Sequence, residues 1–210
     1  GSTLVLSDCT KTGKIIGSKV KSGSGGVAYV KNGTLSVYDI TLTGGSATTG
    51  GAIVVDKDGT LNLYSGEISG NHVTNGKGGA IYVEAGGTLN LYGGTISENT
   101  GAGIDAAYGR VTMAQQSSTI PVEIKNNKGG AISLTRDGST ANLGTGRITG
   151  NSGGKGAVAL SAGSLTLTGD VKIAGNTGAN LYLANGKTVT LDKLGSGAQI
   201  GVTTESTAVP

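Results

Sequence analysis

The 210-residue chain has no Trp, no Phe, two Pro and one Cys. Globular cores usually contain large aromatic side chains, so this core must be built from smaller aliphatic residues. A single cysteine, Cys9, cannot form a disulfide within the chain. The near absence of proline, without a Gly-X-Y period, excludes collagen. No run approaches the roughly 18 apolar residues of a membrane-spanning helix.

Charge is also scarce, since charged residues make up 14% of the chain and the formal net charge is +3. Lys and Arg are scattered, whereas nucleic-acid and membrane-surface sites concentrate them in patches. We therefore expect no nucleic-acid partner and no direct membrane insertion. Much of the surface must be solvated by Thr, Ser, Asn and Gly.

Glycine is abundant, with 41 residues, and much of it belongs to a repeat. The tetrapeptide Gly-Gly-Ala-Ile at residues 50–53 recurs at 78–81 and 129–132. With weaker copies included, the equivalent positions are residues 28, 53, 81, 104, 132, 158 and 181. A period of about 25 residues is typical of a solenoid.

Each repeat contains three short apolar segments. The first follows the glycines, and the second, such as residues 60–63, alternates apolar and polar side chains with the period of a strand. The third is an isolated Ile followed three residues later by Asn, as in Ile68 and Asn71. Three short strands per repeat predict an all-β fold, a single-stranded right-handed parallel β-helix of about eight coils, with equivalent aliphatic residues stacked between coils.

We expect one domain, formed by residues 3–203. Residues 1–2 are interpreted as a cloning scar, and residues 204–210 as a polar C-terminal tail. The apolar residues at 4–6 and 15–16 match the second and third segments of an interrupted coil. No amphipathic capping helix is evident, so the chain is interpreted as part of a longer protein. Residues 114–121 expand one turn and are expected to form a protruding loop.

Gly-Gly-Ala-Ile, followed further along the repeat by a segment such as Ile68-Ser69-Gly70-Asn71, resembles the repeats of bacterial polymorphic outer-membrane proteins. Those proteins are surface-exposed β-helix adhesins of the autotransporter type. The resemblance covers roughly residues 25–185, with Ile where those repeats usually have Phe. It implies a bacterial cell-surface or secreted module, without a cofactor, that binds glycan or a surface protein of a host or neighbouring cell.

Tyr38, Tyr64 and Tyr92 occupy the same position in three consecutive coils and are expected to form an exposed aromatic strip. Aromatic rings with hydroxyl groups could contact sugar rings or a partner chain, so these residues are the candidate ligand-binding site. The simpler alternative is cross-strand packing that only stabilises the sheet.

A column of asparagines follows the third segment of each coil. The interpretation is a structural ladder in which each amide bonds to the next coil; a polar ligand groove is the less favoured alternative. Its predicted members are Asn71, Asn99, Asn127, Asn151 and Asn176.

Lys77, Lys128 and Lys155 each precede a glycine turn. Aligned along the rod, they could form a basic ridge for acidic glycans. A solvated edge that discourages aggregation is the favoured interpretation.

The acidic residues show no catalytic arrangement. Carbohydrate-active β-helices need clustered carboxylates for calcium or acid–base chemistry, whereas Glu67 shares its coil position with Thr95. Asp56 and Asp58 form an ordinary turn, and His72, placed in a loop, lacks a partner at metal spacing. We therefore expect no catalytic residues and no metal site, and favour a non-catalytic binding module. The alternatives are a fragment of a polysaccharide-lyase-like enzyme and, more weakly, a trimeric phage tail-fibre segment.

Overall fold

The computed structural model describes residues 1–20 and 22–205, except for the side chains of residues 75–77. Most of the predicted C-terminal tail, residues 206–210, lies outside the described residues. The described residues form strands and turns, and none of them belongs to a helix long and apolar enough to cross a membrane.

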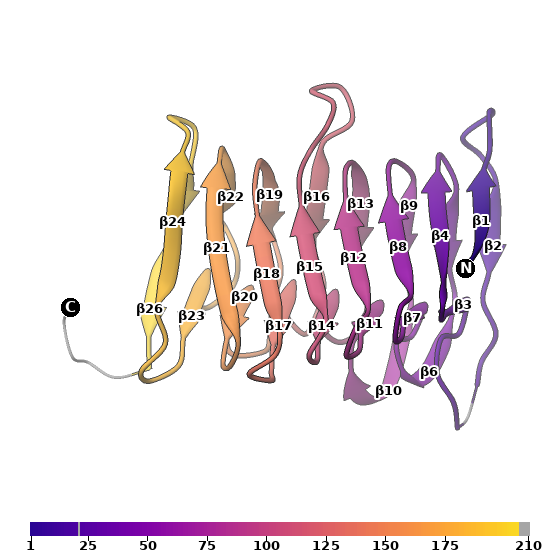
Figure 1. The fold of residues 1–210 in the computed structure, drawn as a ribbon, viewed down its shortest axis with the longest axis horizontal. Coiled ribbons are helices and arrows are strands. Elements are labelled where there is room, and N and C mark those ends of the chain that lie inside the picture. Colours follow the sequence, from indigo (N-terminus) through magenta and orange to yellow (C-terminus); the bar gives the residue numbers. More distant parts are fainter. Residues whose placement is uncertain (21, 206–210) are drawn as a thin grey trace.

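Three parallel sheets of eight strands each run along a rod (Figure 1). Sheet 1, nearest the viewer, consists of β1 (Ser2–Ser7), β4 (Gly33–Tyr38), β8 (Thr60–Leu63), β12 (Thr88–Leu91), β15 (Arg110–Met113), β18 (Thr140–Leu143), β21 (Ser164–Gly169) and β24 (Val189–Leu194). Sheet 2 consists of β2 (Lys14–Ile16), β5 (Thr41–Thr43), β9 (Glu67–Ser69), β13 (Gly94–Ser97), β16 (Val122–Lys125), β19 (Gly146–Thr149), β22 (Val171–Ile173) and β25 (Gln199–Ile200).

Sheet 3 closes each coil. It consists of β3 (Ala28–Val30), β7 (Ile53–Val55), β11 (Ile81–Val83), β14 (Ile104–Ala106), β17 (Ile132–Leu134), β20 (Val158–Leu160), β23 (Leu181–Leu183) and β26 (Val202–Thr204). Each coil therefore supplies one strand to each sheet, and the chain makes about seven turns along the rod. The chain runs up sheet 1, crosses to the more distant sheet 2 and returns through sheet 3 while advancing toward the C-terminus (Figure 1), which is a right-handed path. The predicted fold class is confirmed, with about seven turns where about eight coils were expected.

The predicted stacking of equivalent residues is also confirmed. Ile81 has Ile53 as its Cα partner on one side and Ile104 on the other. The same register continues through Ile132, Val158 and Leu181, so all seven repeat positions form one column of sheet 3. Together with the inward residues of sheets 1 and 2, this column forms one continuous aliphatic core.

The structure explains why glycines precede each sheet 3 strand. Gly50 has a φ of 57°, in the left-handed region where a side chain is unfavourable. Gly51 lies so close to the next coil that a Cβ atom would sit 2.4 Å from the carbonyl oxygen of Gly79. Both glycines are therefore required for the chain to turn into sheet 3 at the spacing of the coils.

Irregular coils occur near the N-terminus and at mid-rod. As expected, β1 and β2 pair with β4 and β5, the second and third segments of the following coil. A two-stranded sheet that the repeat did not predict pairs β6 (Ser46–Thr49) with β10 (His72–Lys77). His72 is exposed, but it begins strand β10, so its predicted placement in a loop was wrong. Residues 114–121 protrude above the rod, as predicted (Figure 1).

Candidate functional site

The asparagine column forms a hydrogen-bonded ladder between sheets 2 and 3. The Nδ2 atom of Asn71 donates to the Oδ1 atom of Asn99 over 3.0 Å, and the Asn71 backbone N–H donates to the same oxygen over 2.9 Å. The same pair of bonds links each later step, from Asn99 to Asn127, Asn127 to Asn151 and Asn151 to Asn176. Because each Oδ1 also accepts from a backbone N–H, the orientation of every amide is fixed.

The ladder has partners at both ends. The backbone N–H of Gly45 donates to the Oδ1 atom of Asn71, and Asn176 donates from Nδ2 to Asn180 over 2.9 Å. Asn180 was not predicted as a member, because it lies outside the Ile-x-x-Asn spacing. Asn71, Asn99, Asn127 and Asn151 are buried, and no buried side-chain nitrogen or oxygen among the described residues lacks a hydrogen bond. This geometry makes the column a structural element and leaves no polar groove there for a ligand.

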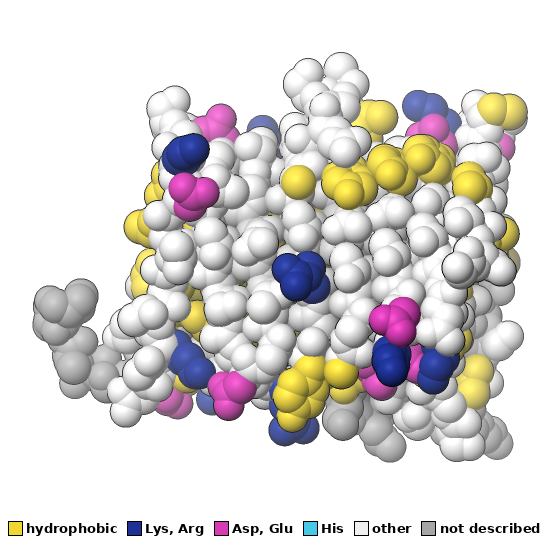
Figure 2. All heavy atoms as spheres, in the orientation of Figure 1, with side chains coloured by type: hydrophobic (Ala, Val, Ile, Leu, Met, Phe, Trp, Pro, Cys, Tyr) yellow, Lys and Arg dark blue, Asp and Glu magenta, His cyan; other side chains and the backbone are white. Residues whose placement is uncertain are grey.

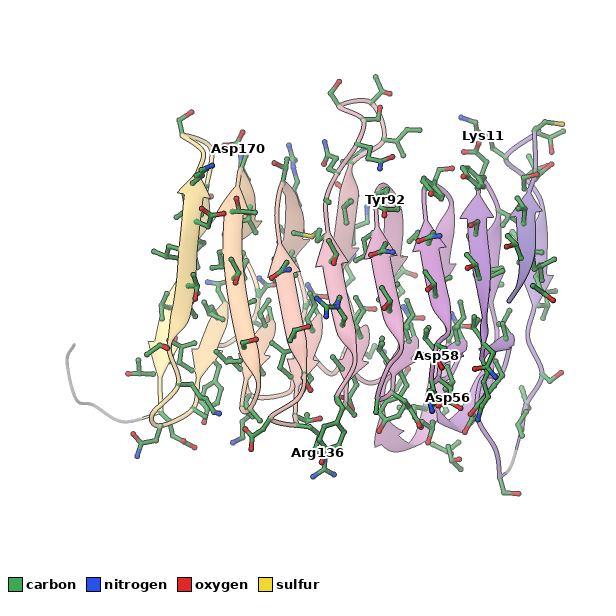
Figure 3. The ribbon with its side chains drawn as sticks, viewed as in Figure 1. Lys11, Asp56, Asp58, Tyr92, Arg136 and Asp170 are labelled. Atoms are coloured by element: carbon green, nitrogen blue, oxygen red, sulfur yellow. The ribbon has the colours of Figure 1, made fainter. Side chains whose placement is uncertain are left out.

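Tyr38, Tyr64 and Tyr92 form a continuous stack on the outer side of the rod, which we call the tyrosine strip. The ring centroids of Tyr38 and Tyr64 are 4.5 Å apart with planes 4° from parallel, and those of Tyr64 and Tyr92 are 4.9 Å apart at 31°. Tyr92 lies at the upper end of β12 (Figure 3), and a row of hydrophobic side chains crosses this part of the near face (Figure 2). Each ring is half-buried, less exposed than the sequence suggested.

Stacking determines which atoms of the tyrosine strip can meet a ligand. Both faces of the Tyr64 ring are covered by its neighbours, so its ring edge and hydroxyl are the parts left for contact. Burial, and secondarily the neighbouring Tyr64 hydroxyl, raises the pKa of Tyr38 above its ordinary value of 10.0. Tyr38 therefore presents a neutral hydroxyl group at neutral pH.

Polar columns run beside the strip along the outer face of sheet 1, which Figure 2 shows to be largely free of charged and apolar side chains. One column contains Ser36, Asn62 and Asn90. The Nδ2 atom of Asn90 donates to the Oδ1 atom of Asn62 over 2.9 Å, so these amides are held in place. Arg110 interrupts the neighbouring threonine column, where it pairs with Thr88. A ligand along this face would meet hydroxyl and amide groups once per coil.

A polar cluster that the sequence did not predict lies at the lower turns near the N-terminal end. The Tyr29 hydroxyl donates to the Oδ2 atom of Asp56 over 2.7 Å, and the Lys31 Nζ atom lies 2.9 Å from the same oxygen. Chiefly through the Tyr29 hydrogen bond, the pKa of Asp56 falls from 3.8 to about 2, while that of Tyr29 rises to about 12. Because three donors from the chain already occupy the Asp56 carboxylate, we interpret the cluster as a clamp between coils.

We expect Asp56→Asn to lower the free energy of unfolding by about 1–2 kcal/mol at pH 7, because charge-assisted hydrogen bonds are lost. The folded-state pKa of Asp56 is depressed, so its contribution is complete above about pH 4 and lost as the pH falls toward about 2. Denaturant unfolding at several pH values should show the difference from the wild type shrinking over that interval.

Asp58→Asn is the matched control for this prediction. Asp58 is exposed in the same turn (Figure 3), and its φ of 57° suits Asn equally well. The Asp58→Asn variant should be about as stable as the wild type, because Asp58 is exposed and lies outside the Asp56 contacts. A similar loss in both variants would show that the turn, and not the Asp56 contacts, is responsible.

Acidic residues are dispersed over the rod. Glu67 has Thr95 as its register partner, as the repeat alignment indicated. Among residues 1–20 and 22–205, no three His, Cys, Asp or Glu side chains come together as possible metal ligands.

The predicted lysine ridge can be followed only in part, because the Lys77 side chain lies outside the described residues. Lys128 and Lys155 are exposed. The Lys155 Nζ atom lies 5.1 Å from the centroid of the Tyr182 ring and 3.8 Å from a Glu205 carboxylate oxygen. Lys155 is therefore engaged with its own neighbours.

No protein-family model matches the chain. No curated protein and no solved structure matches it.

Proposed function

We propose that this chain is a non-catalytic adhesin-type module of a bacterial cell-surface or secreted protein, and that it binds glycan through the tyrosine strip. The observation that carries the proposal is the tyrosine stack itself, three rings in consecutive coils at 4.5 and 4.9 Å. A repeat of the polymorphic outer-membrane type is consistent with this role.

Rigidity supports the proposal in physical terms. Tyrosine offers a large amphipathic contact with few rotatable bonds, and prior ordering lowers the entropy lost on binding. Here the stack orders the hydroxyls before any ligand arrives, and the Asn62–Asn90 hydrogen bond orders the amides beside them. An elongated saccharide lying along the rod would meet the same hydroxyl and amide groups in successive coils.

A glycan array followed by calorimetry with the best ligand tests this proposal. We expect Tyr64→Ala to weaken binding by about tenfold or more, because it opens the centre of the stack. Tyr64→Phe should cause much of the same loss while preserving the stack, since it removes the hydroxyl, one of the two parts of the side chain that the stack leaves for contact. Tyr108→Ala is the matched control, because Tyr108 is 53% exposed and takes no part in the strip.

Unchanged affinity in Tyr64→Ala would remove the strip as the binding site. Binding to a surface protein but to no glycan would replace the proposed ligand class. Turnover of an acidic polysaccharide by the chain alone would favour the lyase-like enzyme alternative and contradict a non-catalytic role.

A further inference from the structure

The turns between sheets 1 and 2 differ in length and so create a cleft at the upper edge of the rod. Residues 114–121 link β15 to β16, and residues 195–198 link β24 to β25, whereas only residues 144–145 and residue 170 make the two links between them. The two longer links rise above the two shorter ones (Figure 1). A hollow of about 370 Å³ lies between them, which we call the upper cleft.

Two cations line the upper cleft on neighbouring strands. Arg147 of β19 and Lys172 of β22 are register partners. Like charges directly opposite one another disfavour a sheet. Neither forms an ion pair with a carboxylate among the described residues. Glu123, the other register partner of Arg147, is instead held by Lys125 at 2.6 Å.

The remaining walls of the upper cleft supply neutral and acidic hydrogen-bonding groups. The loop contributes Gln115, whose Oε1 atom accepts from the Val122 backbone N–H at 3.3 Å. Asp170, at the top of the rod in Figure 3, accepts from the backbone N–H of Gly197 over 2.8 Å, which links two adjacent turns. These contacts fix the walls, while the carboxylates of Glu123 and Asp170 retain lone pairs that can accept hydroxyl hydrogens.

We propose that the upper cleft binds one acidic sugar residue, with its carboxylate or sulfate group on Arg147 and Lys172 and its hydroxyls on Glu123 and Asp170. The choice of a saccharide as the ligand rests on the proposed function. The presence of two neighbouring cations in the cleft is independent of it. The loop that walls the cleft is anchored beside the tyrosine strip, since the backbone N–H of Gln116 donates to the Tyr92 carbonyl over 3.0 Å. The cleft is thus a second site on the far side of that loop.

The charge pattern of the upper cleft distinguishes this ligand class from other anions. A polyphosphate would bring several negative charges toward Glu123 and Asp170, which repel them. A sugar with one acidic group needs cations for that group and hydrogen-bond acceptors for its hydroxyls within a short distance. The cleft holds two cations and two carboxylates. Its volume lies near the lower limit for small-molecule sites, about 300 Å³, and therefore suits a single residue.

Calorimetric titration with trigalacturonate, a sulfated trisaccharide, neutral maltotriose and sodium sulfate tests the proposal. The wild type should bind at least one acidic saccharide more tightly than maltotriose or sulfate. Arg147→Ala/Lys172→Ala should weaken that binding by about tenfold or more, since two charge-assisted contacts are lost. Lys14→Ala/Lys57→Ala removes the same charge from exposed positions outside the cleft and should bind as the wild type does.

Equal losses in the two double variants would show general charge attraction and overturn the site. Sulfate binding as tight as saccharide binding would overturn the sugar assignment, as would the absence of binding to either acidic trisaccharide. Tyr64→Ala separates this proposal from the previous one. It should reduce glycan binding at the strip and leave the preference for the acidic trisaccharide intact. Thermal unfolding of each variant confirms that the rod is folded.

Discussion

Asn99→Ala should lower the free energy of unfolding by about 3–5 kcal/mol, because it leaves several buried polar groups without partners at about 1–3 kcal/mol each. Asn99 is fully buried and accepts from the backbone and side chain of Asn71. It also donates to the Ile68 carbonyl and to Asn127. Denaturant unfolding measures the loss, and amide hydrogen exchange should show opening of the coils on both sides of residue 99.

Asn142→Ala is the control, since Asn142 has the same side chain but is exposed on the outer face of sheet 1. Its effect should stay within about 0.5 kcal/mol. If Asn99→Ala were equally mild, the ladder amides would have little net effect on stability.

Ile81→Ala should destabilise the rod by about 2–5 kcal/mol, because removal of a buried aliphatic side chain loses its transfer free energy and leaves a cavity. Ile81 is fully buried, and its column is packed by Ile53 on one side and Ile104 on the other. A truncation here weakens two coil interfaces at once. Stability in a solenoid is approximately a sum over such interfaces, so hydrogen exchange should rise first in β7, β11 and β14.

Two further variants calibrate this result. Ile81→Val should cost only about 0.5–1.5 kcal/mol, since it deletes a single methyl group. Ile16→Ala changes a residue that is 77% exposed and should alter stability by less than about 0.5 kcal/mol. Similar losses for Ile81→Ala and Ile16→Ala would show that burial in the column does not determine stability.

The sequence was sufficient to predict the core because a solenoid repeats its requirements in every coil. The same environment recurs in each coil, because the residue at this position packs against its equivalents in the coils on either side. An aliphatic residue is therefore found there each time, as at Ile53, Ile81 and Ile104. The spacing that predicted five ladder asparagines could not identify Asn180, which reaches the ladder from the next turn only four residues after Asn176.

The tyrosine strip could be predicted because it repeats one position in three coils, whereas the upper cleft and the Asp56 cluster were harder to predict because they depend on differences between coils. Glu123, Arg147 and Lys172 each precede the inward Ile of the third segment, so alignment could have revealed their common column. These residues line a cleft only because residues 114–121 rise above the shorter turns beside them. The length of that loop is not part of the repeat. The Asp56 cluster joins residues 27 positions apart in sequence through a hydrogen bond from Tyr29. The position of Tyr29 is occupied by Val54 in the next coil and by Tyr82 in the coil after that, so the column itself does not mark the contact that Tyr29 makes with Asp56.

The asparagine ladder also gives the rod an electrical direction. From Asn71 to Asn176, every amide presents its oxygen toward the N-terminal side and one of its N–H groups to the next asparagine on the C-terminal side. The same nitrogen also donates to a backbone carbonyl of the preceding coil. Strand dipoles largely cancel within a sheet, but these side-chain dipoles are parallel and polarise one another along the chain of hydrogen bonds. The interior therefore carries a dipole along its long axis, with the negative pole near Gly45 and the positive pole near Asn180.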